Sequence, residues 1–223
     1  LKVAGGTMHG LSGLHRPAEI PEIMAQARRV AELTRAVGAE HLVFVPVPGY
    51  RDDTTGAYLE PAELTDEQWT TLIRYTNELG RILAGEYGVH LQFHPHADSH
   101  VETQAQTERF LDETDPRFVN LCFDTGHLAY RRADVVGLIR GYPDRIGYVH
   151  IKQMDPAIVE LAREHQALVV VHVAVERLDA AVGDQPEPVG AGLDQEAVVA
   201  DQDDRARIVV DGLHQRRAAV DVE

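Results

Sequence analysis

Three stretches decide the fold: HLQFHPHADSHVET at residues 90–103, NLCFDTGH at 120–127 and YVHIK at 148–152. Each begins in a short apolar run of the kind that forms a buried strand, and each contains polar side chains that can bind a metal. A helical pattern follows each stretch. Polar groups at the ends of successive parallel strands are typical of the active site of a (β/α)8 TIM barrel, so the sequence predicts that fold class.

The composition excludes several classes of protein. The 223 residues suit one large α/β domain, and the proportions of apolar (44%) and charged (26%) residues are those of a globular protein. The formal charge of −15 argues against nucleic acid and membrane surfaces as partners. No apolar run approaches the roughly 20 residues of a membrane helix. The single cysteine, Cys122, favours a reducing compartment, the cytoplasm.

Strand and helix patterns alternate along the chain, which implies parallel strands joined by right-handed crossovers. We expect strands at residues 1–6, 41–49, 89–94, 118–124 and 146–152. We expect helices at residues 21–37, 65–86, 103–112, 134–140 and 156–165. Thr65 and Gln68 have the spacing of a capping box, which supports a helix start at this point.

The end of the chain has a different composition. Residues 155–223 contain no Ser, Thr, Asn, Lys, Cys, Met, Phe, Tyr or Trp. Two short strands are expected there, at 167–175 and 207–210, but the segment has few large side chains to fill a barrel. We therefore divide the chain into a barrel portion, 1–155, and a divergent, poorly packed segment, 156–223. This segment is either a genuine low-complexity tail or an out-of-frame translation of a GC-rich gene.

The alternation of strand side chains places candidate site residues on one face. Residues two apart in a strand point the same way, so three neighbouring strands can deliver polar groups to one inner surface. Mixed carboxylate and imidazole ligands suit a divalent metal. Cys122 is expected one layer deeper and outside this set. The residues that share the surface are His94, Asp124, His150 and Lys152.

Each candidate also has a simpler structural explanation. Asp124 suits a helix N-cap, Glu102 suits a carboxylate at a helix start, and His150 suits a hydrogen-bonded core histidine. The other candidates suit side chains of surface loops or side chains that reach solvent: His94, His96, His127 and Lys152.

These motifs resemble the xylose isomerase-like TIM barrels, also called the sugar phosphate isomerase/epimerase superfamily, which includes inosose dehydratases. The resemblance covers residues 1 to about 155 and rests on FHPHADSHVET, ETDPRFVNLCFDTGHLAYRRAD and YPDRIGYVHIKQMDP. It implies one divalent ion (Mn, Co, Mg, Fe or Zn) with Asp124, His150 and Glu102 as ligands. It also implies catalytic roles for His127, Lys152 and Glu102, and substrate binding by His94, His96, His127 and Lys152.

Two departures from the family pattern stand out. Gln92 lies near the position of the usual first acidic ligand, and no glutamate can be aligned with the last one. The resemblance also implies that Leu1 begins at the third barrel strand, so we expect an incomplete barrel whose first two βα units are missing and whose C-terminal part is divergent.

The family resemblance leads to three functional hypotheses. The first is a metal-dependent sugar isomerase or epimerase that acts next to a carbonyl through an enediolate. The second is an inosose dehydratase-type lyase, and the third is a truncated, non-catalytic barrel fragment. The expected partner is a small sugar or cyclitol. An open barrel also exposes strand edges that favour a homo-oligomer.

Overall fold

The computed structural model describes residues 2–10, 13–52, 57–155 and 159–160. The chain divides into two compact units. One contains Leu1–Arg51 and Tyr58–Gln153, and the other contains Asp52–Ala57 and Met154–Glu223. The fold and the site described below belong to the first unit. The strands expected at 167–175 and 207–210, and almost all of the helix expected at 156–165, lie outside the described residues.

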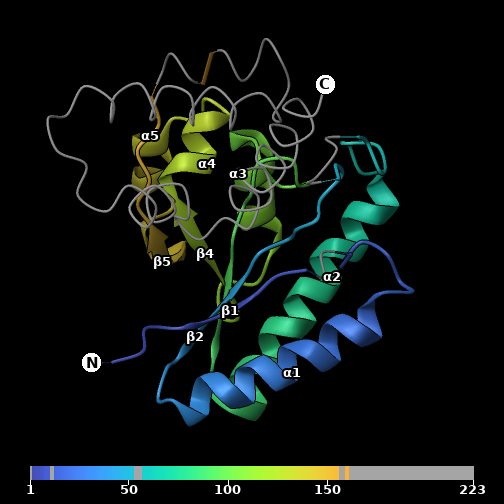
Figure 1. Cartoon of the computed structure of the whole chain (residues 1–223), viewed down its shortest axis with the longest axis vertical. Helices are drawn as coiled ribbons and strands as arrows, with labels where there is room; N and C mark the ends of the chain where they lie inside the picture. Colours follow the sequence, from blue (N-terminus) through green and yellow to red (C-terminus); the bar gives the residue numbers. More distant parts are fainter. Residues whose placement is uncertain (1, 11–12, 53–56, 156–158, 161–223) are drawn as a thin grey trace, which may run out of the picture. The chain divides into compact units, whose positions relative to one another are not determined.

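Five parallel strands form a single sheet in the order β1-β2-β3-β4-β5 (Figure 1). Neighbours in the sheet are therefore neighbours in the sequence, as in a β/α barrel and unlike a doubly wound sheet, whose strand order reverses. The strands are β1 (Gly6–Met8), β2 (His41–Phe44), β3 (His90–Phe93), β4 (Val119–Asp124) and β5 (Ile146–His150). Four of the five were expected at these positions, whereas the strand expected at 1–6 shares only Gly6 with β1. The parallel arrangement is confirmed.

Helices follow the strands as the alternation predicted. The α-helices are α1 (Ile20–Ala36), α2 (Asp66–Ile82), α3 (Gln104–Glu113), α4 (Thr125–Tyr130) and α5 (Val135–Gly141). The capping box at Thr65 is confirmed, because its side chain accepts the backbone N–H of Gln68 while the Gln68 side chain accepts the N–H of Thr65. Thr103 and Gln106 repeat this arrangement at α3.

The bounds of β1 and β2 differ most from the prediction. β1 begins at Gly6 and not at Leu1, because its partner strand begins at His41 and so offers no pairing for the residues before Gly5. β2 ends at Phe44 and not at Gly49. Pro46 and Pro48, which follow, lack the N–H that a sheet ladder requires.

Two helical features were not expected. The helix predicted to reach Glu86 changes at Leu83 to a π-helical turn, Leu83–Tyr87, and ends at Gly88 in the left-handed region (φ 65°). Helix α4 directly follows β4, but its six residues are too few to show an amphipathic period in the sequence. It forms because Asp124 caps its first turn.

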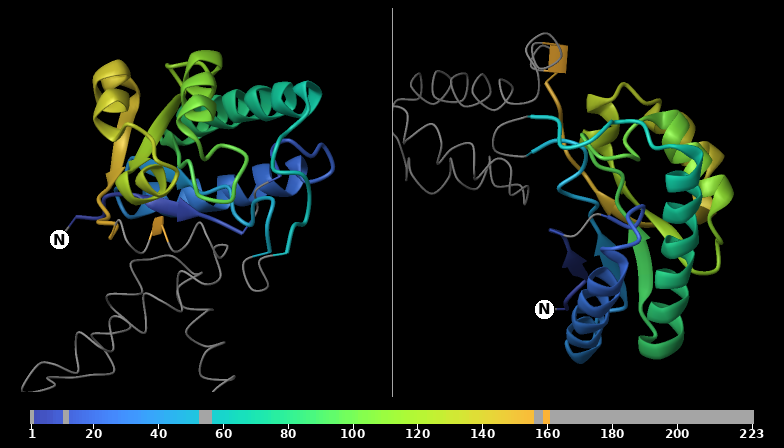
Figure 2. Two further views of the ribbon diagram at one scale, coloured as in Figure 1. Left: turned by 90° about the horizontal axis from the view of Figure 1, so that it is seen from above. Right: turned by 90° about the vertical axis from the view of Figure 1, so that its right-hand side faces the viewer.

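Helices α1 and α2 lie side by side and pack on the sheet (Figures 1 and 2). α1 packs on β1 and β2, whereas α2 packs on β3 and β4. The core between the helices and the strands contains fully buried aromatic side chains: Phe44, Phe93, Phe110 and Phe123. Among the described residues, no helix is both long and apolar enough to cross a membrane.

Gly80 allows α2 to approach the chain close to β4. A Cβ at Gly80 would overlap the backbone carbonyl oxygen of Phe118, whereas a Cβ at Gly85 would meet nothing within 4 Å. We expect Gly80→Ala to lower the free energy of unfolding by about 1–3 kcal/mol through overpacking. The matched variant Gly85→Ala should leave it unchanged or raise it by up to about 1 kcal/mol. Urea unfolding measures both, and equal effects of the two variants would contradict the packing described.

Candidate active site

Three predicted site residues converge at the ends of β3, β4 and β5. The β4–β5 register pairs Asp124 with His150, and His94 directly follows β3. His94 Nε2 lies 3.2 Å from Asp124 Oδ2 and 3.1 Å from His150 Nδ1. His150 Nδ1 lies 3.5 Å from the same carboxylate oxygen. Strand register alone therefore brings one carboxylate and two imidazoles, far apart in sequence, into one cluster.

The two carboxylate oxygens of Asp124 contact different groups. Oδ1 accepts the backbone N–H groups of Gly126 and His127, 2.9 Å from each, and so caps α4. Oδ2 faces His94 and His150. The N-cap interpretation of Asp124 is therefore confirmed, and it leaves the site role open as a prediction, because a carboxylate can accept several hydrogen bonds at once.

Burial and hydrogen bonding set the charges of this cluster. Burial by itself would raise the pKa of Asp124, but hydrogen bonds from His150 and His94 outweigh it and hold the pKa well below its usual range. Burial lowers the pKa of His94 to about 4, although Asp124 opposes the shift. At neutral pH the cluster therefore combines an ionised carboxylate with a neutral His94, which are the protonation states required of metal ligands.

Lys152 and His127 lie next to the cluster. Lys152 Nζ is 3.3 Å from Asp124 Oδ2 and 3.4 Å from His127 Nε2. The Lys152 backbone is held by Thr125, whose hydroxyl donates to the Lys152 carbonyl and accepts its N–H, both at 2.8 Å. The ammonium is thus turned towards the site, so the interpretation of Lys152 as a side chain that only reaches solvent is wrong.

The three histidines of the HPH and DTGH motifs stack together. The His96 and His127 rings are 3.7 Å apart at their centroids, and His94 is 5.3 Å from His127. His94 and His96 are buried (2% and 3% exposed), so they are not surface-loop histidines. Burial lowers the pKa of His127 well below its usual value, and His96 and His94 add to the shift. The backbone N–H of Ala97 donates to His127 Nδ1, so a neutral His127 carries its proton on Nε2.

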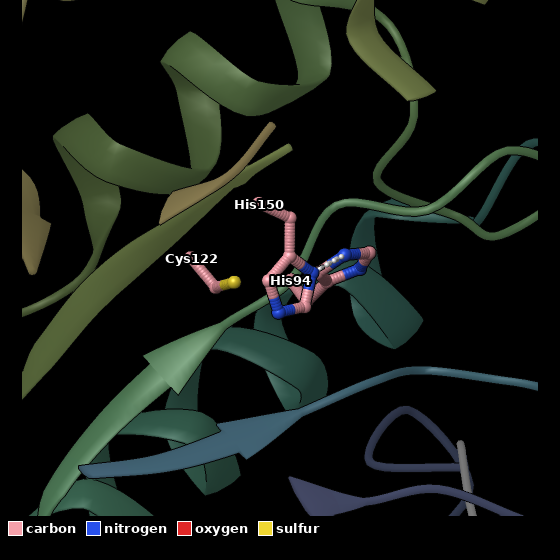
Figure 3. A group of neighbouring side chains, drawn as sticks. All are labelled: His94, Cys122 and His150. Carbon is pink, nitrogen blue, oxygen red and sulfur yellow. Dashed lines mark hydrogen bonds between the residues drawn. The ribbon is translucent and has the colours of Figure 1, made fainter. Parts of the chain in front are cut away.

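Cys122 lies nearer to the site than its sequence position suggested. Its sulfur is within 4.8 Å of ligand atoms of His94 and His150, and Figure 3 shows it turned towards the two imidazoles. Cys122 pairs with Tyr148, one layer below the pair of Asp124 and His150 as expected, but its sulfur still reaches the two imidazoles. Burial raises the pKa of the Cys122 thiol above its usual range, and Asp124 adds to this. The sulfur is therefore a neutral thiol and a poor metal ligand.

Glu102 is held by a different set of partners. It accepts hydrogen bonds from the Tyr50 hydroxyl (2.9 Å) and the Asp98 backbone N–H (2.6 Å), and it forms an ion pair with Arg131. Burial raises the pKa of Glu102, whereas Arg131 opposes the shift. A ligand or catalytic role for Glu102 stays a prediction, because the structure does not place it with Asp124 and His150.

Gln92 also lies apart from the cluster and hydrogen bonds to His41 Nδ1 at 3.0 Å. His94, two residues later, stands next to Asp124 instead. The nitrogen of His94 is therefore the candidate to replace the first acidic ligand of the family pattern.

Sequence reasoning missed the residues that support the site. Arg131 donates to Tyr50 and to Asp98, both at 2.9 Å, and so joins the loops after β2 and β3 to helix α4. These residues are 81 and 33 positions from Arg131 in the sequence, so no local pattern connects them. Asp98 has a φ of 62°, in the left-handed region of backbone conformation. Asp adopts this region more readily than most residues, and this is the one local feature that the sequence offered here.

The cluster fits a divalent metal ion. His94 Nδ1 is buried and has no hydrogen-bond partner, and the ligand atoms of His94, Asp124 and His127 lie within 4.8 Å of one another. Carboxylate and imidazole donors suit Zn²⁺, Mn²⁺, Co²⁺ and Fe²⁺. The residues placed to hold such an ion are Asp124, His94 and His150, whose facing atoms are 3.2 Å, 3.1 Å and 3.5 Å apart.

The chain belongs to the xylose isomerase-like TIM barrel family, whose model matches residues 2–201. An inosose dehydratase of Bacillus velezensis is 40% identical over 107 residues. The alignment includes 48% of this chain and 36% of that protein, so the chain spans about a third of the length of this curated relative. The family and the TIM-barrel fold predicted from the sequence are thereby confirmed.

Solved structures agree on the fold. A probable 3-DHS dehydratase of Bacillus anthracis, AsbF, has a TM-score of 0.57 at 13% identity and covers 70% of this chain and 53% of its own. The IOLI protein, solved with a zinc atom, has a TM-score of 0.51 at 17% identity and covers 66% of this chain and 58% of its own. At these identities the likeness concerns the fold alone.

The pKa of His94 leads to a pH-dependent stability. Its folded-state pKa of about 4 is below the ordinary value of 6.5, so between these values the unfolded chain takes up a proton that the folded chain does not. We expect the free energy of unfolding of the metal-free protein to fall as pH decreases through this window, and Asp124 to extend the loss at lower pH. An NMR titration of the ring nitrogens, with His94→Gln to identify the signal, measures the pKa. A His94 signal that titrates near pH 6.5 would contradict the prediction.

Proposed function

We propose that this chain carries the site of an inosose dehydratase-type lyase, which removes water from a cyclitol ketone with the aid of a divalent metal. The observation that carries the proposal is the cluster of Asp124 with His94 and His150, in a chain 40% identical to an inosose dehydratase over 107 residues. A substrate ketone would bind beside this cluster, where Lys152 and His127 lie.

Asp124, His94 and His150 would hold the ion. When bound, a divalent ion at this position would polarise the substrate carbonyl and lower the cost of forming an enediolate. Asp124 contributes the negative charge, and the cap of α4 fixes the orientation of its carboxylate. The buried imidazole of His94 stays neutral, so its lone pair is available without prior loss of a proton.

Lys152 and His127 would stabilise charge on the substrate oxygens. The Lys152 ammonium and the Nε2–H of His127 are both hydrogen-bond donors at the edge of the cluster. Donors held in place before the reaction stabilise an oxyanion without the cost of reorganisation. In a dehydration, a carboxylate or histidine of the site takes up the α-proton, and the electron pair of that C–H bond forms the enediolate and then expels the β-hydroxyl, which takes up a proton and leaves as water. The Lys152 ammonium, which lies beside His127, is suited to donate that proton.

The second candidate is the isomerase or epimerase activity expected from the sequence motifs. The same Lys152 and His127 donors favour it, because isomerisation of a ketose also passes through an enediolate next to the carbonyl. The two activities differ in the fate of the enediolate. Loss of the β-hydroxyl gives dehydration, whereas return of the proton to carbon gives an isomer.

The products separate these candidates. The chain, loaded with Zn²⁺, Mn²⁺ or Co²⁺, is incubated with 2-keto-myo-inositol and with ketose sugars, and the products are analysed by mass spectrometry. A diketone that has lost one water supports the lyase, whereas an isomer of unchanged mass from a ketose supports the second candidate. Metal binding without turnover of any substrate would support the third hypothesis, a non-catalytic fragment.

Asp124→Asn tests the proposed ligand. Asparagine keeps the helix cap but removes the negative charge, so we expect metal affinity and kcat/KM to fall by about 10²-fold or more. Asp134→Asn is the matched control, because Asp134 caps α5 through Gly137 in the same way and lies on another helix. Metal titration and steady-state kinetics measure the effects. Equal activity of the two variants would refute the role of Asp124.

Lys152→Met tests the oxyanion donor. The chain has two lysines, Lys2 and Lys152, so Lys2→Met provides a control with the same change of charge at an exposed position. We expect Lys152→Met to lower kcat by about 10²–10³-fold, since it removes a preorganised donor. Metal affinity should change little, because Lys152 is not a ligand. An unchanged kcat would contradict the assigned role.

A further inference from the structure

We propose that His15, Glu60 and His100 form a second divalent-cation site, suited to Zn²⁺, whose role is structural. These residues lie on the loops after β1, β2 and β3 and share none of the ligands of the Asp124 cluster. A cation here would tie three consecutive loops at the same end of the sheet. The proposal does not depend on the reaction assigned above.

The geometry brings three ligand atoms together. His15 Nε2 is 3.1 Å and His100 Nε2 is 2.8 Å from the same oxygen, Oε1 of Glu60. All three ligand atoms lie within 4.8 Å of one another. Both histidines are nearly buried, at 3% and 7% exposed, and their rings meet edge to face at 4.5 Å. Two imidazoles and a carboxylate are ligands that Zn²⁺ commonly takes in proteins, and a further donor would complete its tetrahedron.

His100 is oriented so that its Nε2 faces Glu60. Its Nδ1 is 2.9 Å from the carbonyl oxygen of Ala62, which can only accept, so Nδ1 carries a proton. Nε2 lies 2.8 Å from Glu60 Oε1, so a cation would bind Nε2 and Oε1 while Nδ1 keeps its hydrogen bond to Ala62. A ring N–H donated to a backbone carbonyl is also the usual arrangement of a metal-bound histidine.

The protonation states of the residues around the site favour the binding of a cation. Burial lowers the pKa of His15 to about 4, and His100 adds to the shift, so His15 is a neutral ligand. Burial would raise the pKa of Glu60, but hydrogen bonds from Arg16 and His100 lower it to about 2, so it is ionised. Arg16 pairs with Glu60 and also with Glu19, at 2.7 Å. Two carboxylates thus face one guanidinium, and Arg16 keeps a partner when Glu60 binds a cation.

The site would act on the loop that carries the HPH motif. His100 lies four residues after His96, and its ring is 5.9 Å from the ring of Tyr50, which hydrogen bonds to Glu102. A cation on His100 would hold this loop to the loops that carry His15 and Glu60. Its effect is thus on stability and on the order of the loop, and not on a chemical step.

Zinc titration in an Asp124→Asn background tests the proposal, because this substitution removes a ligand of the first site. The full chain is stripped with a chelator and titrated with Zn²⁺ against a chromophoric competitor. We expect Asp124→Asn to bind one equivalent and its melting temperature to rise with Zn²⁺. Adding Glu60→Gln should weaken this binding more than about 100-fold, since even partners beyond the ligands contribute 10–100-fold. His100→Gln, which keeps a donor for Ala62, should do the same.

Glu22→Gln is the matched control in the same background. Glu22 forms an exposed ion pair with Arg29, so its substitution removes the same charge outside the site and should leave Zn²⁺ affinity unchanged. Circular dichroism of each metal-free variant verifies folding, and His100→Gln gives the decisive comparison if Glu60→Gln unfolds. The proposal is overturned if Asp124→Asn binds no Zn²⁺, or if Glu60→Gln and His100→Gln bind it as tightly as Glu22→Gln. If the Asp124 cluster binds no metal while the second site does, the unmodified chain will bind one equivalent of Zn²⁺ and not two.

Discussion

The carboxylate of Asp124 is the interaction on which the rest of the site depends. It ends β4, begins α4 and faces two imidazoles from neighbouring strands. A buried carboxylate without partners would carry a large desolvation cost, and here the helix N–H groups and the histidines offset it. The same contacts fix its orientation. Stability and binding geometry therefore come from one set of hydrogen bonds, and the loss of either oxygen's partners would disturb both.

Parallel strands explain why polar residues gather at one end of the sheet. Each strand runs from the same side, so the loops after β1, β2 and β3 and the helix after β4 meet at the carboxyl ends. Two clusters lie at this end of the sheet: the cluster around Asp124, and the cluster of His15, Glu60 and His100. The Tyr50, Asp98, Glu102 and Arg131 network also joins these loops. The apolar core, in contrast, lies between the strands and helices α1 and α2, where no site residue is found among the described positions.

Much of the fold was readable from local patterns. Apolar runs identified four of the five strands, and the Thr65 capping box placed the start of α2 to the residue. The wrong predictions concern features that depend on contacts with residues far away in the sequence. β1 starts late because β2 has nothing to pair with the residues before it, and Cys122 comes close to His94 and His150 because these histidines lie at the ends of the neighbouring strands. Helix α4 was not predicted, because its six residues are too few to show a helical period of apolar side chains.

By itself the sequence determined the fold family and the types of residue at the strand ends, since hydrophobic period, capping chemistry and the DTGH and VHIK motifs are all local. Only the tertiary structure decided which of those residues meet. It joined His94 to Asp124 and His150, separated Glu102 from them by pairing it with Arg131, and assembled His15 with Glu60 and His100. The physical reason is that such contacts depend on strand register and loop packing, which act between residues tens of positions apart and leave no periodic trace in the chain.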